Sequence, residues 1–133
     1  MKLLDTTFLI HYWAGRDSVA EYLSAHEESE FVTTTLNLKE IAVGRELQGS
    51  GDRHEVESTF EWVRVIPFKR DHAFVAGEFE AALRRDETLN QDKINSLAAD
   101  LLIAAVANAT GATVVTKNVA DFEIFPGVSV DSY

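Results

Sequence analysis

The sequence contains no cysteine among its 133 residues. It therefore forms no disulfide and offers no thiolate to a metal ion, which fits a cytoplasmic protein. No apolar run approaches the roughly 20 residues that a membrane helix requires, and the first residues lack the apolar segment of a secretory signal. These absences lead us to expect a cytoplasmic location and no contact with a membrane.

Positive charge is also scarce. Lys and Arg together number 12 against 22 Asp and Glu, so the formal net charge is −10. Because Lys and Arg drive binding to phosphates by displacing counterions, any nucleic-acid partner would have to be bound locally. This balance resembles that of proteins from a salt-rich cytoplasm, where a Debye length of a few ångströms would screen the repulsion of an anionic substrate.

Several common site motifs are missing. The four histidines are too scattered along the sequence to form a helical zinc pair. Neither of the glycine-rich loops that bind phosphates, G-x-x-x-x-G-K-[ST] and G-x-G-x-x-G, occurs. A zinc site and a nucleotide-binding loop are therefore not expected.

What the sequence does contain is a series of short apolar runs separated by helical patterns. Because the runs are apolar on both faces, they predict a parallel sheet between two helix layers. We expect an α/β fold, a three-layer α/β/α arrangement around about five strands, in a single domain over residues 1–133. The predicted strands are residues 2–4, 31–34, 63–67, 113–116 and 128–130.

Helices are predicted between these strands. The first begins with Thr6 or Thr7 as its N-cap, and the polar stretch 86–95 is predicted to be a loop. Phe74, Val75, Phe79 and Leu83 are expected to face inward from a long amphipathic helix, and an earlier helix carries Leu38, Ile41, Ala42 and Leu47. The predicted helices are residues 6–13, 17–26, 35–47, 52–62, 71–85 and 100–109, with a short one after Asn118.

Acidic side chains stand where several of these elements begin or end. Asp5 follows the first strand, Asp121 follows the fourth, and Asp100 opens the most apolar helix of the chain. In parallel sheets, ligands bind beyond the carboxyl ends of the strands. We therefore expect these carboxylates to approach one another at one edge of the sheet.

Each carboxylate also has a purely structural interpretation. Glu40 could form a capping box with Asn37, and Asp121 could cap similarly with Asn118. Asp100 could simply stabilise its helix by placing a negative charge at the positive end of the helix dipole, and Asp5 could form an Asx turn. Four carboxylates gathered together, however, would repel one another unless a hard cation lay among them.

The chain resembles the PIN-domain family, and within it the VapC-type toxins of toxin–antitoxin pairs, along nearly its whole length. The resemblance rests on Leu4-Asp5-Thr6-Thr7, Glu40-Ile41, Asp100-Leu-Leu-Ile-Ala-Ala and Thr116-Lys-Asn118-Val-Ala-Asp121-Phe122. It implies an endoribonuclease that depends on Mg²⁺ or Mn²⁺, acts on RNA, is inhibited by a cognate antitoxin and usually forms a homodimer. It also implies that Asp5, Glu40, Asp100 and Asp121 are the catalytic acidic quartet.

Within that quartet, Asp5, Asp100 and Asp121 are the expected metal ligands, and Glu40 is expected to position water or a second metal ion. Four further residues complete the predicted site as supporting or substrate-binding groups: Thr6, Thr116, Lys117 and Asn118. Tyr12, Trp13 and Leu47 are expected to be exposed near the ends of the first and third helices, where an antitoxin segment could lie.

Two other functions stay open. One is a phosphoryl-transfer domain with Asp and Mg²⁺, although no second aspartate closely follows Asp5 as the Asp-x-Asp motif requires. The other is a non-catalytic module that binds RNA or protein.

Overall fold

A computed structural model describes all residues, 1–133, and contains one five-stranded sheet. The strand order is β3-β2-β1-β4-β5, and every neighbouring pair is parallel. The predicted α/β class and the number of strands are therefore confirmed. The strands are β1 (Lys2–Leu4), β2 (Phe31–Thr34), β3 (Arg64–Ile66), β4 (Thr113–Val115) and β5 (Ser129–Asp131).

Eight helices connect or follow the strands. The prediction of a loop over residues 86–95 was wrong, because α6 lies within it. That helix is short and polar, and Ile94 is its only buried residue, so its apolar pattern is too weak to recognise. The helices are α1 (Thr6–Trp13), α2 (Asp17–Ala25), α3 (Thr35–Leu47), α4 (Arg53–Thr59), α5 (Arg70–Arg85), α6 (Gln91–Ser96), α7 (Ala98–Thr110) and α8 (Val119–Glu123).

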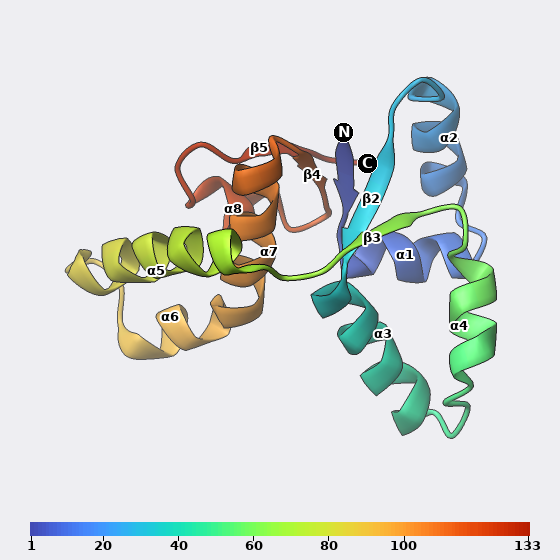
Figure 1. The fold of residues 1–133 in the computed structure, drawn as a ribbon, viewed down its shortest axis with the longest axis horizontal. Helices are drawn as coiled ribbons and strands as arrows, with labels where there is room; N and C mark the ends of the chain where they lie inside the picture. The colour runs from blue at the N-terminus through green and yellow to red at the C-terminus, as the bar shows by residue number, and fades with distance from the viewer.

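The sheet separates two hydrophobic cores, as alternation along the strands requires. Leu3 and Val114 belong to the larger core, with residues from α5, α7 and α8. Leu4 and Val115, the next residue on each strand, belong to the smaller core, with residues from α1, α2 and α3. Figure 1 shows α5, α6 and α7 on one side of the strands and α1 and α2 on the other. This is the expected three-layer arrangement.

Helix α7 is the most deeply buried helix. Six of its residues are buried, including all of Ile103–Ala107, which agrees with the apolar character of the sequence on every side. Gly111 ends the helix in a left-handed conformation (φ 73°) that most residues avoid. Its N-terminal turn holds Asp100 against α3 and beside α6.

One predicted helix cap was wrong, and the structural alternative for Glu40 is excluded. Asp5, and not Thr6 or Thr7, is the N-cap of α1, because its carboxylate accepts a hydrogen bond from the Thr6 amide. The capping box of α3 pairs Thr34 with Asn37, so Glu40 takes no part in it. Asp5 therefore caps a helix at the edge where the strands end. Glu40 has no capping role there.

One apolar side chain expected to face inward is exposed instead. Phe74 is 70% exposed, because α5 buries the face that carries His72, Ala76 and Phe79, and Phe74 lies two residues out of step with it. Leu47, in the last turn of α3, is 84% exposed. None of the helices is both long enough and apolar enough to cross a membrane.

Strand β1 is the point at which the sheet stops growing on one side and starts to grow on the other. From β1 the chain first builds β2 and β3 on one side and later returns to place β4 and β5 on the other. A crevice at the carboxyl ends of β1 and β4 is where this kind of sheet binds ligands. Asp5 directly follows β1 and Thr116 directly follows β4.

Candidate active site

Asp5 is the centre of a hydrogen-bond network at this edge. It is only 4% exposed, and its carboxylate accepts hydrogen bonds from the Thr6 amide (2.9 Å), the Thr116 hydroxyl (2.8 Å) and the Asn37 side chain (3.4 Å). Burial raises the pKa of Asp5, and these three hydrogen bonds partly oppose that rise. The network therefore holds a buried carboxylate in one orientation.

Asn37 links this network to α3. Its side-chain oxygen accepts hydrogen bonds from the amide and hydroxyl of Thr34, while its NH₂ group donates to Asp5 and to the Thr6 hydroxyl (3.0 Å). The Thr6 hydroxyl in turn donates to Glu40 (3.1 Å). One fully buried amide thus connects two members of the predicted quartet, although the sequence interpretation gave Asn37 no place in the site.

Asp100 faces this network from the first turn of α7. Its pKa is raised to about 6, first by burial and then by the negative charges of Asp5, Asp121 and Glu40. Nothing donates a hydrogen bond to its carboxylate, and only Lys93 offsets these effects. The other three predicted acidic residues therefore all lie within electrostatic reach of Asp100.

Glu40 and Asp121 complete the group. Burial raises the pKa of Glu40, the hydrogen bond from Thr6 opposes this rise, and the charge of Asp5 adds to it. Asp121, in α8, forms an ion pair with Lys93 (3.3 Å). Lys93 was not identified from the sequence, because it lies in the stretch that was predicted to be a loop and belongs to no recognised motif.

The supporting residues divide into two groups. Thr6 and Thr116 are part of the Asp5 network, and the Thr116 hydroxyl also accepts a hydrogen bond from the Asn118 amide (2.9 Å). The side chain of Asn118 is exposed and makes no hydrogen bond to the carboxylates. Lys117 is exposed too and lies against Tyr133, so it contacts none of the quartet.

The donor atoms suit a hard divalent cation. The four side chains offer only carboxylate oxygens, which Mg²⁺ and Mn²⁺ prefer to softer ligands. No three His, Cys, Asp or Glu side chains lie close enough together to enclose an ion by themselves. Mg²⁺ commonly uses one or two carboxylates and keeps several waters, so this spacing fits it. The assignment of Asp5, Asp100 and Asp121 as direct ligands stays a prediction.

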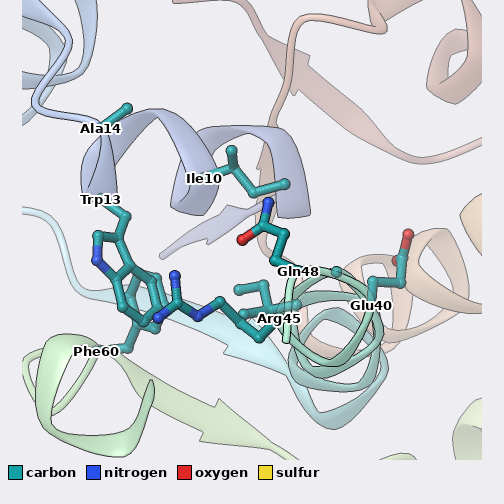
Figure 2. Close-up of a pocket in the computed structure, with 9 residues that line it drawn as sticks. Ile10, Trp13, Ala14, Glu40, Arg45, Gln48 and Phe60 are labelled. Atoms are coloured by element: carbon teal, nitrogen blue, oxygen red, sulfur yellow. The ribbon is translucent and has the colours of Figure 1, made fainter. Parts of the chain in front are cut away.

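A groove opens beside this site between α1 and α3. Its volume is about 250 Å³, and its nine lining residues include Ile10, Trp13, Arg45 and Phe60, with Glu40 at the acidic site. Figure 2 shows Trp13 and Phe60 at one end of the groove and Glu40 at the other, with the Arg45 guanidinium against the Trp13 ring. The groove therefore joins an aromatic surface to the carboxylates.

The PIN domain family matches residues 2–125. No curated protein sequence matches the chain.

Solved structures with the same fold come from several bacteria. VapBC2 from Rickettsia felis, bound to a DNA fragment from its promoter, has a TM-score of 0.79 at 22% identity, covering 99% of this chain and 98% of its own. DNA-bound VapBC from Salmonella typhimurium has a TM-score of 0.81 at 24% identity over 98% and 96% of the two chains. A toxin–antitoxin complex from Klebsiella pneumoniae has a TM-score of 0.68 at 24% identity over 96% and 95%.

Proposed function

The chain belongs to the PIN domain family, and from that premise we propose that it is a metal-dependent endoribonuclease, the toxin of a toxin–antitoxin pair. The observation that carries the proposal is the gathering of three carboxylates around the partly buried Asp100; burial and these charges together raise the pKa of Asp100 to about 6. Strongly perturbed carboxylates at a sheet switch point are typical of catalytic sites. Similar folds occur in VapBC and toxin–antitoxin complexes.

In the proposed reaction, Asp5 and Asp100 would bind Mg²⁺ or Mn²⁺ directly, and Asp121 would bind it through a coordinated water. The bound ion would lower the pKa of a coordinated water and offset the negative charge that builds up on the phosphate. Thr6, Asn37 and Thr116 fix the orientation of Asp5 through the hydrogen bonds described above. Such preorganisation matters because a ligand shifted by about 1 Å can cost two orders of magnitude in rate.

Glu40 is proposed to orient the attacking water. The hydrogen bond from Thr6 holds one oxygen of its carboxylate, which leaves the other free to accept a proton from water. The raised pKa of Glu40 makes it a better proton acceptor than an ordinary glutamate. No side-chain nucleophile is needed in this mechanism.

The test is cleavage of RNA with and without metal. We expect purified protein to cut structured RNA in Mg²⁺ or Mn²⁺ and to lose this activity in EDTA and in the Asp5→Asn variant. Sequencing the 5′ ends of the fragments would identify the target. Full activity in EDTA would reject the metal mechanism, and metal binding by calorimetry without any cleavage would favour the non-catalytic module.

The partner proposed for the groove is a segment of a cognate antitoxin. Tyr12 and Trp13 are only partly exposed because they pack on Phe60, so the accessible apolar residue that lines the groove is Ile10 (52% exposed). An apolar segment could lie along Ile10 while an arginine reaches the carboxylates at Glu40. This correction moves the expected contact from the aromatic side chains to Ile10.

Substitution of Ile10 tests the partner proposal. Ile10→Asp should release the co-purifying antitoxin, whereas Phe74→Asp, at a more exposed apolar position on α5, should retain it. Equal retention of the antitoxin by both variants would count against the groove as its binding site.

We also propose that the protein forms a homodimer, which light scattering of the antitoxin-free protein would test.

A further inference from the structure

A second group of side chains lies next to Asp5 and takes no part in the acidic quartet. It consists of His11 from α1, Arg16 at the start of α2, Lys117 after β4 and Tyr133 after β5, and we call it the Tyr133 cluster. Because β1, β4 and β5 are parallel, the segments that follow them leave the sheet at the same edge. The cluster therefore borders the candidate active site.

Packing fixes the ring of Tyr133. Its hydroxyl shares a hydrogen bond of 2.8 Å with Nδ1 of His11, and its ring packs edge to face on Phe8 with centroids 4.8 Å apart. The Lys117 ammonium lies 4.3 Å from the ring centroid and contacts the main-chain carbonyl of Tyr133. Lys117 itself is exposed, so an anionic ligand can reach its ammonium from solvent.

The cluster is electrostatically coupled to the acidic site. Burial raises the pKa of Tyr133 to about 12, and the charge of Asp5 adds to this rise while Arg16 opposes it. Thr116, which donates its hydroxyl hydrogen bond to Asp5, directly precedes Lys117 in the chain. A ligand on the Tyr133 ring would therefore lie beside the carboxylates.

The cluster also carries positive charge. The chain has a net charge of −10, yet Lys117 and Arg16 are both exposed here and neither pairs with an acidic side chain. Cations beside an aromatic ring are the elements that bind single-stranded nucleic acid: the ring stacks on a base, and the cations hold phosphates.

We propose that the Tyr133 cluster is a nucleotide-binding subsite for single-stranded RNA, in which a base stacks on the Tyr133 ring and Lys117 and Arg16 hold the adjoining phosphates. Lys117 moves from the ring to a phosphate, and the base takes its place. His11 holds the phenol so that the ring is oriented before RNA binds. This inference rests on the proposed function, since it places the substrate strand of that same site.

The test measures binding of a fluorescent single-stranded RNA 12-mer of mixed sequence, in an Asp100→Asn background that prevents cleavage. Removal of the ring in Tyr133→Leu should weaken binding about tenfold, as is usual for one stacked base. Tyr133→Phe keeps the ring and should bind within about twofold of the parent protein. Lys117→Gln should reduce the slope of log K against log salt by about 0.7, the value for one phosphate on a single strand.

Two controls distinguish stacking from folding. A 12-mer without bases should bind the Tyr133→Leu and parent proteins equally, which a merely structural role for the ring would not predict. Arg85→Gln removes an exposed cation at the end of α5 and should leave the affinity and salt slope unchanged. In Figure 1 that end of α5 lies on the far side of the molecule from α1.

The outcomes separate this inference from the proposed function. If the native protein cuts RNA in Mg²⁺ and Tyr133→Leu binds and cuts it equally well, the subsite is wrong and the nuclease assignment stands. Equal loss of binding in Tyr133→Leu and Tyr133→Phe, or a loss of antitoxin capture with unchanged RNA binding, would also overturn the subsite. If the native protein binds the 12-mer through Tyr133 but cuts no RNA, the subsite holds and the nuclease assignment fails.

Discussion

Asp100 is the residue at which folding and the proposed function oppose each other most directly. Its carboxylate is partly buried, has no hydrogen-bond donor and faces three other carboxylates. A residue that served only the dipole of α7 would not need such neighbours, because a single charge near the helix start is already favourable. The surroundings of Asp100 are costly for the metal-free fold and become favourable only with a cation.

Asp100→Asn should therefore separate stability from activity. The amide removes the repulsion and keeps nearly the same shape, so we expect the metal-free variant to be more stable by about 0.5–2 kcal/mol and to lose RNA cleavage. The gain in stability is small because solvent screens the charge of the partly exposed Asp100 carboxylate. Thermal melts in EDTA and in Mg²⁺ measure the effect, and Mg²⁺ should raise the Tm of the native protein more than that of the variant. An active but destabilised variant would reject the catalytic assignment.

The stability difference should also depend on pH. The pKa of Asp100 is about 6 in the folded protein, against about 3.9 for an ordinary aspartate in the unfolded chain. The folded state therefore binds the proton more tightly, and the stability gained from it is complete below pH 4 and lost as the pH rises through 6. In EDTA, the advantage of Asp100→Asn should be largest at pH 7 and should shrink toward pH 4. A constant advantage over this range would contradict the assigned pKa.

At the scale of elements, the start of α3 joins helix capping to the site. Asn37 caps α3 with Thr34 and also donates to Asp5 and Thr6, all within buried surroundings. Most N-caps have only the first of these tasks. The orientation of Asp5 is thus coupled to the integrity of a helix that begins at the neighbouring strand.

Asn37→Ala should destabilise the protein by about 1–3 kcal/mol, because it removes a cap and leaves buried polar groups without a partner. Asn90→Ala is the matched control, since Asn90 caps α6 through one exposed hydrogen bond to the Lys93 amide and should cost about 1 kcal/mol or less. Urea unfolding of the two variants measures both values. Equal costs would mean that the buried network adds nothing to the cap.

The sequence predicted some of these elements and site residues but not others. The β-branched and apolar runs predicted all five strands, and the apolar face of the sequence around Ile103 predicted the central helix. Helix α6 and its Lys93 were missed because six mostly polar residues carry no recognisable periodicity. Asn37 was missed for a different reason. Its partners Asp5 and Thr6 are more than 30 residues away, so only the folded chain reveals their contact.

For the whole molecule, the dominant property is unpaired negative charge. Only six of the 22 acidic side chains form ion pairs. The remaining carboxylates repel one another across the surface, and that repulsion opposes the compact state. The Tyr133 cluster and Lys93 stand out against this background as local sources of positive charge.

Salt should therefore stabilise the fold while weakening RNA binding. Raising KCl from 0.1 to 1 M shortens the Debye length from about 10 to 3 Å, which screens the surface repulsion. We expect the Tm to rise with KCl and the affinity for the RNA 12-mer to fall, the latter through Lys117 and Arg16. Melting curves and binding titrations over the same KCl series provide the measurement. A Tm and an activity that are both indifferent to molar KCl would reject adaptation to a salt-rich cytoplasm.

The hydrogen bond between Asp5 and Thr116 has a consequence for synthesis on the ribosome. The two residues are 111 positions apart in the chain, and β4 must insert beside β1 before they can meet. Asp100 and Asp121 also belong to the late part of the chain. If the chain is the proposed nuclease, a nascent polypeptide that has folded only β1, β2 and β3 still lacks the complete site, so the messenger that encodes it would not be exposed to this activity until synthesis has passed Asp121.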